Sequence, residues 1–224
     1  ELSYNNPLYT RDGLDTYEEV DPKHNYVITV DVARGQGLDY SAFIVFDITE
    51  IPYKIVAKYK NNLIAPLVFP NIINIIAKRY NEAYILVEIN DIGSQVSDVL
   101  HHDLEYENLF STAWFGRHGQ QLSGFGGGKR DSQFGVKTSK QVKKIGCSNL
   151  KALVEDDKLL IQDYDCISEL TTFVSSLDSY SAEDGAHDDL AMTLVLFGWL
   201  VDQQYFKELN NQNIRDNLYK NQLS

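Results

Sequence analysis

Apolar and polar positions along this chain follow two periods. Three β-branched and apolar runs lie near the N-terminus, and the short gaps between them favour an antiparallel meander. Farther along, apolar residues recur at helical spacing, and short apolar runs between them are typical of buried strands. The pattern predicts strands at residues 26–32, 41–48, 53–59, 84–88, 109–114 and 159–161, and helices at 65–79, 93–102, 138–155, 167–177 and 188–201.

The order of these elements predicts an α/β domain. Three antiparallel strands are followed by strands that alternate with helices, which indicates a mixed sheet with helices on its faces. Residues 1–24 are polar and rich in turn formers, and we interpret them as a linker or arm. Residues 25–205 then form the domain, and residues 206–224, rich in Asn and Gln, a frayed polar tail.

A glycine-rich segment lies at residues 116–136. So much glycine predicts a mobile loop, and such loops often carry function. A plain connector is the alternative. Its glycines are Gly116, Gly119, Gly124, Gly126, Gly127, Gly128 and Gly135.

Charge is unevenly distributed. A net charge of −12 argues against a protein that coats nucleic acid by charge alone. Within residues 129–151, however, Asp131 is the one acid among seven basic residues, and most of these lie on the helix that Thr138 is expected to cap. The strip either contacts phosphates or is a solvated helix face. Its basic residues are Lys129, Arg130, Lys137, Lys140, Lys143, Lys144 and Lys151.

Composition excludes some classes of protein. No apolar run reaches the roughly 18 residues that a membrane span needs. Cys147 and Cys166 lack the spacing of a metal knuckle and indicate no disulfide scaffold, which favours a reducing cytoplasm. The chain begins at Glu1 with neither an initiator Met nor a signal region, and we expect it to be cut from a longer protein.

Carboxylates lie in unexpected places. Asp31 lies inside an apolar strand, Glu88 closes another, and Asp188 and Asp189 begin an apolar helix. Burying a carboxylate is costly without a partner, so acids from three segments suggest one site where cations offset their repulsion. Carboxylate oxygens favour Mg²⁺ or Mn²⁺, and no Cys and His cluster suits zinc. Two such ions about 4 Å apart can clamp a phosphodiester during hydrolysis.

Each acid also has a structural interpretation. Asp31 could cap the turn that follows it, and Glu88 could pair with a lysine. Asp188 could be an ordinary helix N-cap, and His187 is expected to support the site rather than to ligate metal. Asp39 could return to the site as a further ligand or only solvate the turn.

Three motifs resemble those of the nuclease domain of tailed-phage large terminases. Residues 30–42, VDVARGQGLDYSA, resemble the first motif, residues 85–90, ILVEIN, the second, and residues 185–192, GAHDDLAM, the third. The helix at residues 147–155 is similar to one in T-even-type members. The likeness covers most of residues 25–205, and the three motifs in this order are specific.

The resemblance implies a ribonuclease-H/resolvase-like fold and a domain that cuts concatemeric viral DNA at the start and end of packaging. It implies double-stranded DNA, a packaging ATPase domain in the same full-length chain, the portal and the small terminase as partners. The expected location is the host cytoplasm, transiently on the prohead.

The family pattern also implies roles for individual acids. The catalytic triad falls on Asp31, Glu88 and one of the two adjacent aspartates, of which we choose Asp189. Asp188 and Asp39 are expected to lie near the metal as further ligands. Two Mg²⁺ or Mn²⁺ ions are expected.

The sequence departs from a complete large terminase in one respect. The phosphate-binding loop G-x-x-x-x-G-K-[ST] has no match, because Arg130 stands where the motif of residues 124–129 would have to continue. This chain alone is therefore not expected to hydrolyse ATP. The basic residues are expected to follow the DNA backbone, and the glycine-rich loop to gate or guide the duplex. The expected DNA-binding residues are Lys129, Arg130, Lys137, Lys140, Lys143 and Lys144.

Three other functions remain open. A Holliday-junction resolvase or transposase-like nuclease would use similar acids on branched DNA. A module that docks on a portal or capsid would carry vestigial acids. A phosphotransferase of the actin and sugar-kinase type would need two glycine-rich phosphate loops, and the second is not evident.

Overall fold

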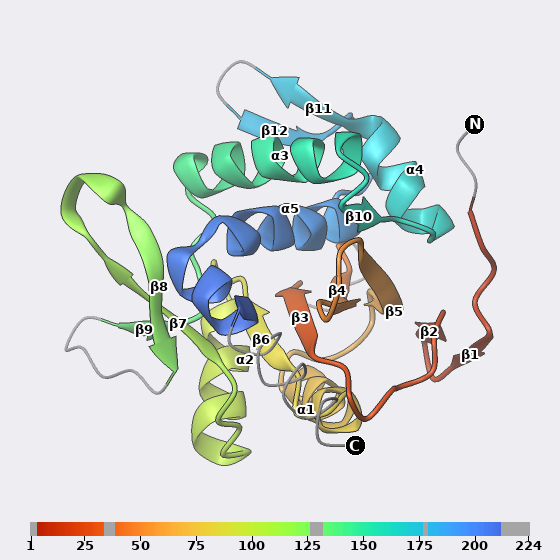
Figure 1. Ribbon diagram of the computed structural model, residues 1–224, viewed down its shortest axis with the longest axis horizontal. Helices are drawn as coiled ribbons and strands as arrows, with labels where there is room; N and C mark the ends of the chain where they lie inside the picture. Colours follow the sequence, from red (N-terminus) through yellow and green to blue (C-terminus); the bar gives the residue numbers. More distant parts are fainter. Residues whose placement is uncertain (1–3, 34–38, 126–131, 177–178, 212–224) are drawn as a thin grey trace.

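A mixed sheet forms the centre of the computed structural model, which describes residues 4–33, 39–125, 132–176 and 179–211 (Figure 1). Its strand order is β1-β2-β5-β4-β3-β6, with β10 beside β5. Antiparallel pairing joins β3, β4 and β5, whereas β6 runs parallel to β3, which confirms the predicted mixed sheet. The strands are β1 (Tyr9–Arg11), β2 (Leu14–Thr16), β3 (Tyr26–Asp31), β4 (Ser41–Asp47), β5 (Tyr53–Asn61), β6 (Tyr84–Val87) and β10 (Leu159–Leu160).

Helices cover both faces of the sheet, as predicted (Figure 1). Successive side chains of β3 point to opposite faces, so Val27 packs in one core and Ile28 in the other. The Val27 core includes α3 (Lys140–Glu155) and α5 (Asp189–Asp202). The Ile28 core includes α1 (Phe69–Arg79), which has Pro70 in its first turn as expected, and α2 (Gly93–Asp98), which continues as the π-helix η1 (Val99–Asp103).

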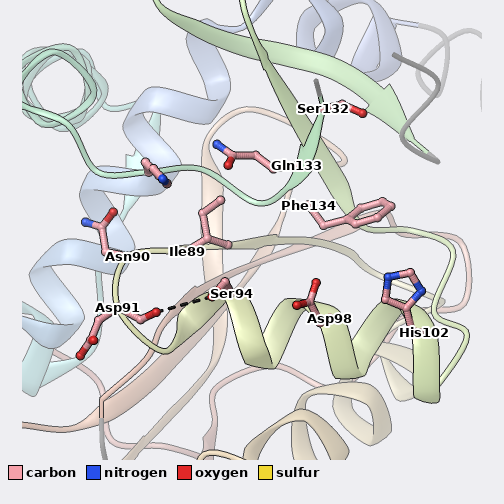
Figure 2. A pocket seen from close by; sticks show the side chains of 10 residues that line it. Ile89, Asn90, Asp91, Ser94, Asp98, His102, Ser132, Gln133 and Phe134 are labelled. Carbon is pink, nitrogen blue, oxygen red and sulfur yellow. Dashed lines mark hydrogen bonds between the residues drawn. The ribbon is translucent and has the colours of Figure 1, made fainter. Parts of the chain in front are cut away.

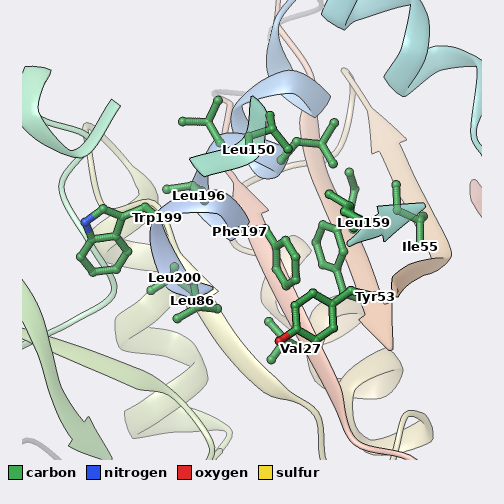
Figure 3. Packing of buried hydrophobic residues seen from close by; sticks show 14 of the residues in the cluster. Val27, Tyr53, Ile55, Leu86, Leu150, Leu159, Leu196, Phe197, Trp199 and Leu200 are labelled. Atoms are coloured by element: carbon green, nitrogen blue, oxygen red, sulfur yellow. The ribbon is translucent and has the colours of Figure 1, made fainter. Parts of the chain in front are cut away.

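The core beneath α5 combines aromatic and aliphatic side chains (Figure 3). The ring of Phe197 stacks on Phe46 at 4.0 Å between centroids and meets Tyr53 edge-on at 5.6 Å. Phe46, Phe197 and Trp199 are at most 1% exposed, and each contributes about 2–3 kcal/mol by leaving water. This packing fixes α5 on the sheet and therefore fixes where its first residue lies.

Glycine lets α3 cross α5 closely. A Cβ on Gly146 would lie 2.3 Å from the carbonyl oxygen of Val195, and one on Gly198 would lie 2.4 Å from that of Gly146. Leu150 also lies against Gly198, so the two helices touch closely where they cross.

The N-terminal segment differs from the expected linker or arm at residues 1–24. Residues 9–16 form β1 and β2, and β2 pairs antiparallel with β5 at the sheet edge. Leu14 and Thr16 are buried there. These strands are short and polar on one side, so periodicity over three residues could not reveal them. The domain boundary at residue 24 stays a prediction.

The described part of the glycine-rich segment at residues 116–136 contains strands, whereas a loop was predicted. Residues 120–125 and 133–134 belong to a small sheet in the order β8-β7-β9. Residues 126–131 lie outside the described residues. The elements are β7 (Phe110–Trp114), the 3-10 turn η2 (Gly116–His118), β8 (Gln120–Phe125) and β9 (Gln133–Phe134).

Several predicted boundaries shift. Ser139, not Thr138, caps α3, since its hydroxyl accepts the Val142 N–H. The helix predicted at 167–177 is α4 (Tyr164–Thr172), which is followed by a hairpin of β11 (Phe173–Ser176) and β12 (Ser179–Ala182).

The expected frayed tail at 206–224 is helical up to residue 211, with Phe206 buried, while residues 212–224 lie outside the described part. Cys147 and Cys166 are both free thiols. No described helix has the length and apolar content needed to cross a bilayer.

Candidate active site

Asp31 and Glu88 meet at the carboxyl ends of two neighbouring parallel strands. Val30 of β3 pairs with Val87 of β6, so the next residue on each strand leaves the sheet at the same edge. The two carboxyl side chains lie within hydrogen-bonding range of each other. Burial, and after it the nearby charge of Glu88, raises the pKa of Asp31 well above its usual value.

The backbone of Glu88 is held from several sides. Its N–H donates to Val30 O at 2.9 Å, and the residue forms a parallel bridge with Val136. A Cβ on Gly93 would lie 1.9 Å from the Glu88 carbonyl oxygen, and one on Gly135, at φ +101°, would lie 2.4 Å from that of Val87. These glycines let two segments approach Glu88, and no larger residue fits without displacing it.

Asp189 joins the two acids from the first turn of α5. Asp189 is only 7% exposed, and its Oδ1 accepts the backbone N–H of Tyr40 at 3.0 Å. Its Oδ2 is buried without a hydrogen-bond partner, and His187 Nδ1 is 3.8 Å away. Burial raises the pKa of Asp189 to about 6. A buried carboxylate oxygen without a partner is suited to binding a cation.

Asp188 lies beside Asp189 but differs in its contacts. It occupies the N-cap position of α5, yet its side chain makes no capping hydrogen bond. Instead, Oδ2 accepts the N–H of Ala182 at 3.2 Å. The charges of both aspartates further raise the pKa of Asp31, so the four acids form one electrostatic unit. Asp188 is therefore not an ordinary N-cap, while the turn that Asp31 could cap lies outside the described residues.

No lysine within the described part of the chain pairs with Glu88, which does not favour the structural alternative. Asn90 Nδ2 donates to Glu88 Oε1 at 3.0 Å. Asn90 also lines a cavity of about 780 Å³ (Figure 2). Ser94, Asp98 and His102 border this cavity on α2 and η1, and Gln133 and Phe134 border it from β9. The acidic site thus continues into a wide polar cavity.

The predicted basic residues that the structure describes fall into three groups. Lys137 is exposed, lines the cavity and directly follows Val136, the bridge partner of Glu88. Lys140 and Lys144 are exposed on the first turns of α3. Lys143 instead donates to the carbonyl of Tyr180 at 2.8 Å, so part of its donor capacity holds the β11–β12 hairpin. Lys129 and Arg130 lie outside the described residues.

Asp39 is exposed and immediately precedes Tyr40, whose backbone binds Asp189. The turn of residues 34–38 before it lies outside the described part of the chain. His187 is exposed, and its ring meets Tyr40 edge-on at 5.1 Å. Both residues therefore border the acid group from the same side.

Glu169 and Lys60 also contact this region, and sequence reasoning missed them. Glu169 Oε2 accepts the N–H groups of Leu190 at 2.7 Å and Ala191 at 3.0 Å. Its other oxygen pairs with Lys60, whose Nζ lies 4.3 Å from the centre of the Tyr40 ring. One signal was present: Glu169 follows the buried Cys166 by three residues, so both share the inner face of α4.

A second acidic group lies elsewhere, at β2 and α4. The carboxylates of Asp15, Asp163 and Asp165 lie within 4.8 Å of one another, the one acid or thiol group this compact among the described residues. Lys58 Nζ already fills it, at 2.9 Å from Asp15, 2.9 Å from Asp163 and 2.6 Å from Asp165. This group is a buried ion-pair network rather than the metal site, and the acids at Asp31 are spread more widely.

A family model confirms the predicted resemblance. The terminase RNaseH-like domain matches residues 28–197, which is most of the chain. The chain belongs to this family. The match begins in β3 and ends in α5, so it includes Asp31, Glu88 and Asp189.

Solved structures agree with this assignment in fold. The large terminase nuclease of thermophilic phage G20c with bound magnesium has a TM-score of 0.66 at 20% identity, over 88% of this chain and 92% of that one. The large terminase nuclease domain of Thermus phage P74-26 has a TM-score of 0.63 at 20% identity, over 89% and 90%. The predicted ribonuclease-H-like fold is confirmed.

Proposed function

We propose that this chain is a metal-dependent DNA endonuclease, the part of a large terminase that cuts concatemeric viral DNA during genome packaging. One observation carries the proposal. Asp31, Glu88 and Asp189 come from three separate elements and share one end of the sheet, where the Oδ2 of Asp189 has no partner among the described residues. The solved relatives include large terminase nucleases with bound magnesium and with bound cobalt, which supports a metal centre here.

The acids fit hard divalent cations. All donors are carboxylate oxygens, which Mg²⁺ and Mn²⁺ prefer. Asp31, Glu88 and Asp189 would hold the ions, with Asp188 beside them and Asp39 at the exposed margin. The spread of these acids beyond a single compact group suits two ions rather than one. When bound, the ions activate a water and stabilise the leaving 3′-oxygen of a phosphodiester.

The residues of this chain prepare the site for that chemistry. The N–H of Tyr40 holds one oxygen of Asp189, which leaves the other directed to a ligand. Asn90 similarly holds one oxygen of Glu88. The raised pKa of Asp31 reflects its burial and, after that, the crowding of negative charge that a cation would relieve. Hydrolysis with such a site requires no covalent intermediate on the protein.

Basic residues beside the site would position the duplex. Lys137, Lys140 and Lys144 are exposed, and Lys137 directly follows Val136, the bridge partner of Glu88. Their contacts would be with phosphates, which fix register without reading sequence. We also propose Lys143, Lys129 and Arg130 as DNA-binding residues, because they belong to the same basic run of the sequence. The polar cavity beside Glu88 is wide enough to admit part of the nucleic acid.

The biological setting follows from the family. We propose that this domain works with a packaging ATPase domain, the portal and the small terminase, in the host cytoplasm and on the prohead. A resolvase would prefer four-way junctions, whereas a terminase nuclease acts on linear duplex. Comparing the two substrates separates these functions.

Plasmid cleavage with Mg²⁺ or Mn²⁺, and with EDTA as the control, tests the proposal. Asp31→Asn, Glu88→Gln and Asp189→Asn are each expected to abolish cutting while circular dichroism shows a folded domain. Asp103→Asn, at an exposed acid of η1, is the matched control and is expected to cut like the parent. Cutting that survives all three substitutions, or that resists EDTA, would contradict the proposed site.

A further inference from the structure

The helix that presents Asp189 has an unusual N-terminus. The first N–H groups of a helix lack partners within it, and the N-cap side chain ordinarily accepts from them. Asp188 stands at that position in α5 but makes no such bond, because its Oδ2 accepts from Ala182 instead. A capping bond would have turned the Asp188 carboxylate toward its own helix and away from a ligand.

Glu169 of α4 supplies the missing acceptor. Its Oε2 accepts from both Leu190 and Ala191, the two residues after Asp189. The side chain is buried, and a negative charge at a helix N-terminus is favourable. The first turn of α5 is therefore held from a neighbouring helix rather than by its own sequence.

Lys60 links this cap to the other support of Asp189. Its ammonium pairs with the second oxygen of Glu169 and lies over the ring of Tyr40. The N–H of Tyr40 in turn holds Asp189 Oδ1. Both the main chain and the side chain of Asp189 are thus fixed around one buried ion pair.

We propose that Glu169 and Lys60 are positioning residues, which cap α5 in place of Asp188 and so direct the carboxylates of Asp188 and Asp189 to metal. This inference rests on the proposed function, since it assigns the pair a task in the same site. Neither residue is proposed to touch metal or DNA. Their effect is on the geometry of the acids that do.

Two measurements on Glu169→Ala test the inference in the whole chain. Amide hydrogen exchange of the metal-free protein is expected to become faster at Leu190 and Ala191. Mn²⁺ affinity, measured by calorimetry, is expected to fall about 10- to 100-fold, the range for residues that orient metal ligands. Glu169→Gln keeps an oxygen acceptor. It is therefore expected to show a smaller increase in amide exchange and a smaller fall in Mn²⁺ affinity than Glu169→Ala.

Leu200→Ala is the matched control, because it removes a buried side chain from the last turn of α5 and leaves the first turn intact. It is expected to lower the melting temperature without changing Mn²⁺ affinity. Equal loss of Mn²⁺ affinity in Leu200→Ala and Glu169→Ala would overturn the inference, because it would mean general destabilisation. Unchanged amide exchange at Leu190 and Ala191 in Glu169→Ala would also overturn the inference. The proposed function fails on a different result, namely unaltered Mn²⁺ binding in Asp189→Asn.

Discussion

Two groups of carboxylates in this protein differ in their supply of positive charge. Around Asp163, the ammonium of Lys58 lies within 3 Å of three carboxylates. Around Asp31, no lysine or arginine of the described residues pairs with the four acids, and His187 is 3.8 Å from Asp189. The first group has its counter-charge within the fold, whereas in the second no described lysine or arginine forms an ion pair with the acids.

The pKa values of the two groups follow this difference. Both are desolvated, but hydrogen bonds from Tyr17 and the charge of Lys58 outweigh burial and lower the pKa of Asp163. At the other group, burial and neighbouring acids raise the pKa of Asp31. A compact set of acids is thus not enough to identify a metal site. Acids that the fold leaves without a counter-charge are the better indicator.

The largest expected effect is that substitutions in the two groups have different consequences, one for DNA cleavage and one for stability. Asp189→Asn is expected to slow DNA cleavage by about three orders of magnitude, because metal ligation stabilises the transition state by several kcal/mol. Asp163→Asn is expected to lower the melting temperature and to cleave at the parental rate below it. Cleavage rates and thermal unfolding of both variants check this. If Asp163→Asn lost DNA cleavage and Asp189→Asn lost only thermal stability, the roles given to the two groups would be wrong.

Removing the internal cation tests the completed group alone. Lys58→Met leaves three carboxylates around an apolar side chain, so the free energy of unfolding is expected to fall by about 3–5 kcal/mol. Lys158→Met is the control, since its bond to Asp156 is solvent-exposed and is worth at most about 1 kcal/mol. Urea unfolding measures both. Equal losses in the two variants would remove the distinction between buried and surface pairs.

A pH titration of stability sharpens the comparison. The folded-state pKa of Asp189 is raised to about 6, so its contribution to stability is present below about pH 4 and is lost as pH rises to 6. The lowered pKa of Asp163 acts with the opposite sign, because its contribution is lost as pH falls below its unfolded value.

In the metal-free protein, Asp189→Asn is therefore expected to lose less stability than the parent between pH 4 and pH 6, by up to about 3 kcal/mol. Added Mg²⁺ is expected to restore the stability of the parent protein at pH 7. Melting temperatures of the parent and Asp189→Asn across this pH range test this prediction. A steeper loss in Asp189→Asn than in the parent would contradict the sign.

The smallest expected effect concerns the basic surface. Lys144→Ala is expected to weaken duplex binding a few-fold and to reduce the slope of log affinity against log salt by about 1, because one phosphate contact is lost. Lys78→Ala, on the opposite face in α1, is the control and is expected to leave both unchanged. Fluorescence anisotropy over a salt series measures them. Identical slopes for parent and Lys144→Ala would exclude that lysine from the DNA path.

The acid site was predictable from sequence to a large extent. Asp31 and Glu88 each follow a strongly apolar strand, where a carboxylate is costly to bury without a partner. Asp189 begins a helix that is buried nearly throughout, so a carboxylate in its first turn also needs a partner. In these three cases, the apolar sequence of the buried element makes the acidic residue at its end stand out as a candidate site residue.

The supporting residues were not predictable in the same way. Glu169 and Lys60 lie in elements with mixed polarity, where an acid or a lysine normally faces water. Their meeting depends on α4 packing against the start of α5, which no local pattern encodes. The strands β1 and β2 were not predicted for a similar reason, since they pair with each other and β2 pairs with the distant β5.

Anomalous scattering from Mn²⁺ soaked into crystals of this protein tests the central claim most directly. The account predicts anomalous peaks between Asp31, Glu88 and Asp189, with the Oδ2 of Asp189 as a ligand, and none at Lys58. Peaks among Asp15, Asp163 and Asp165 instead, or no peak near Asp31 at saturating Mn²⁺, would contradict it.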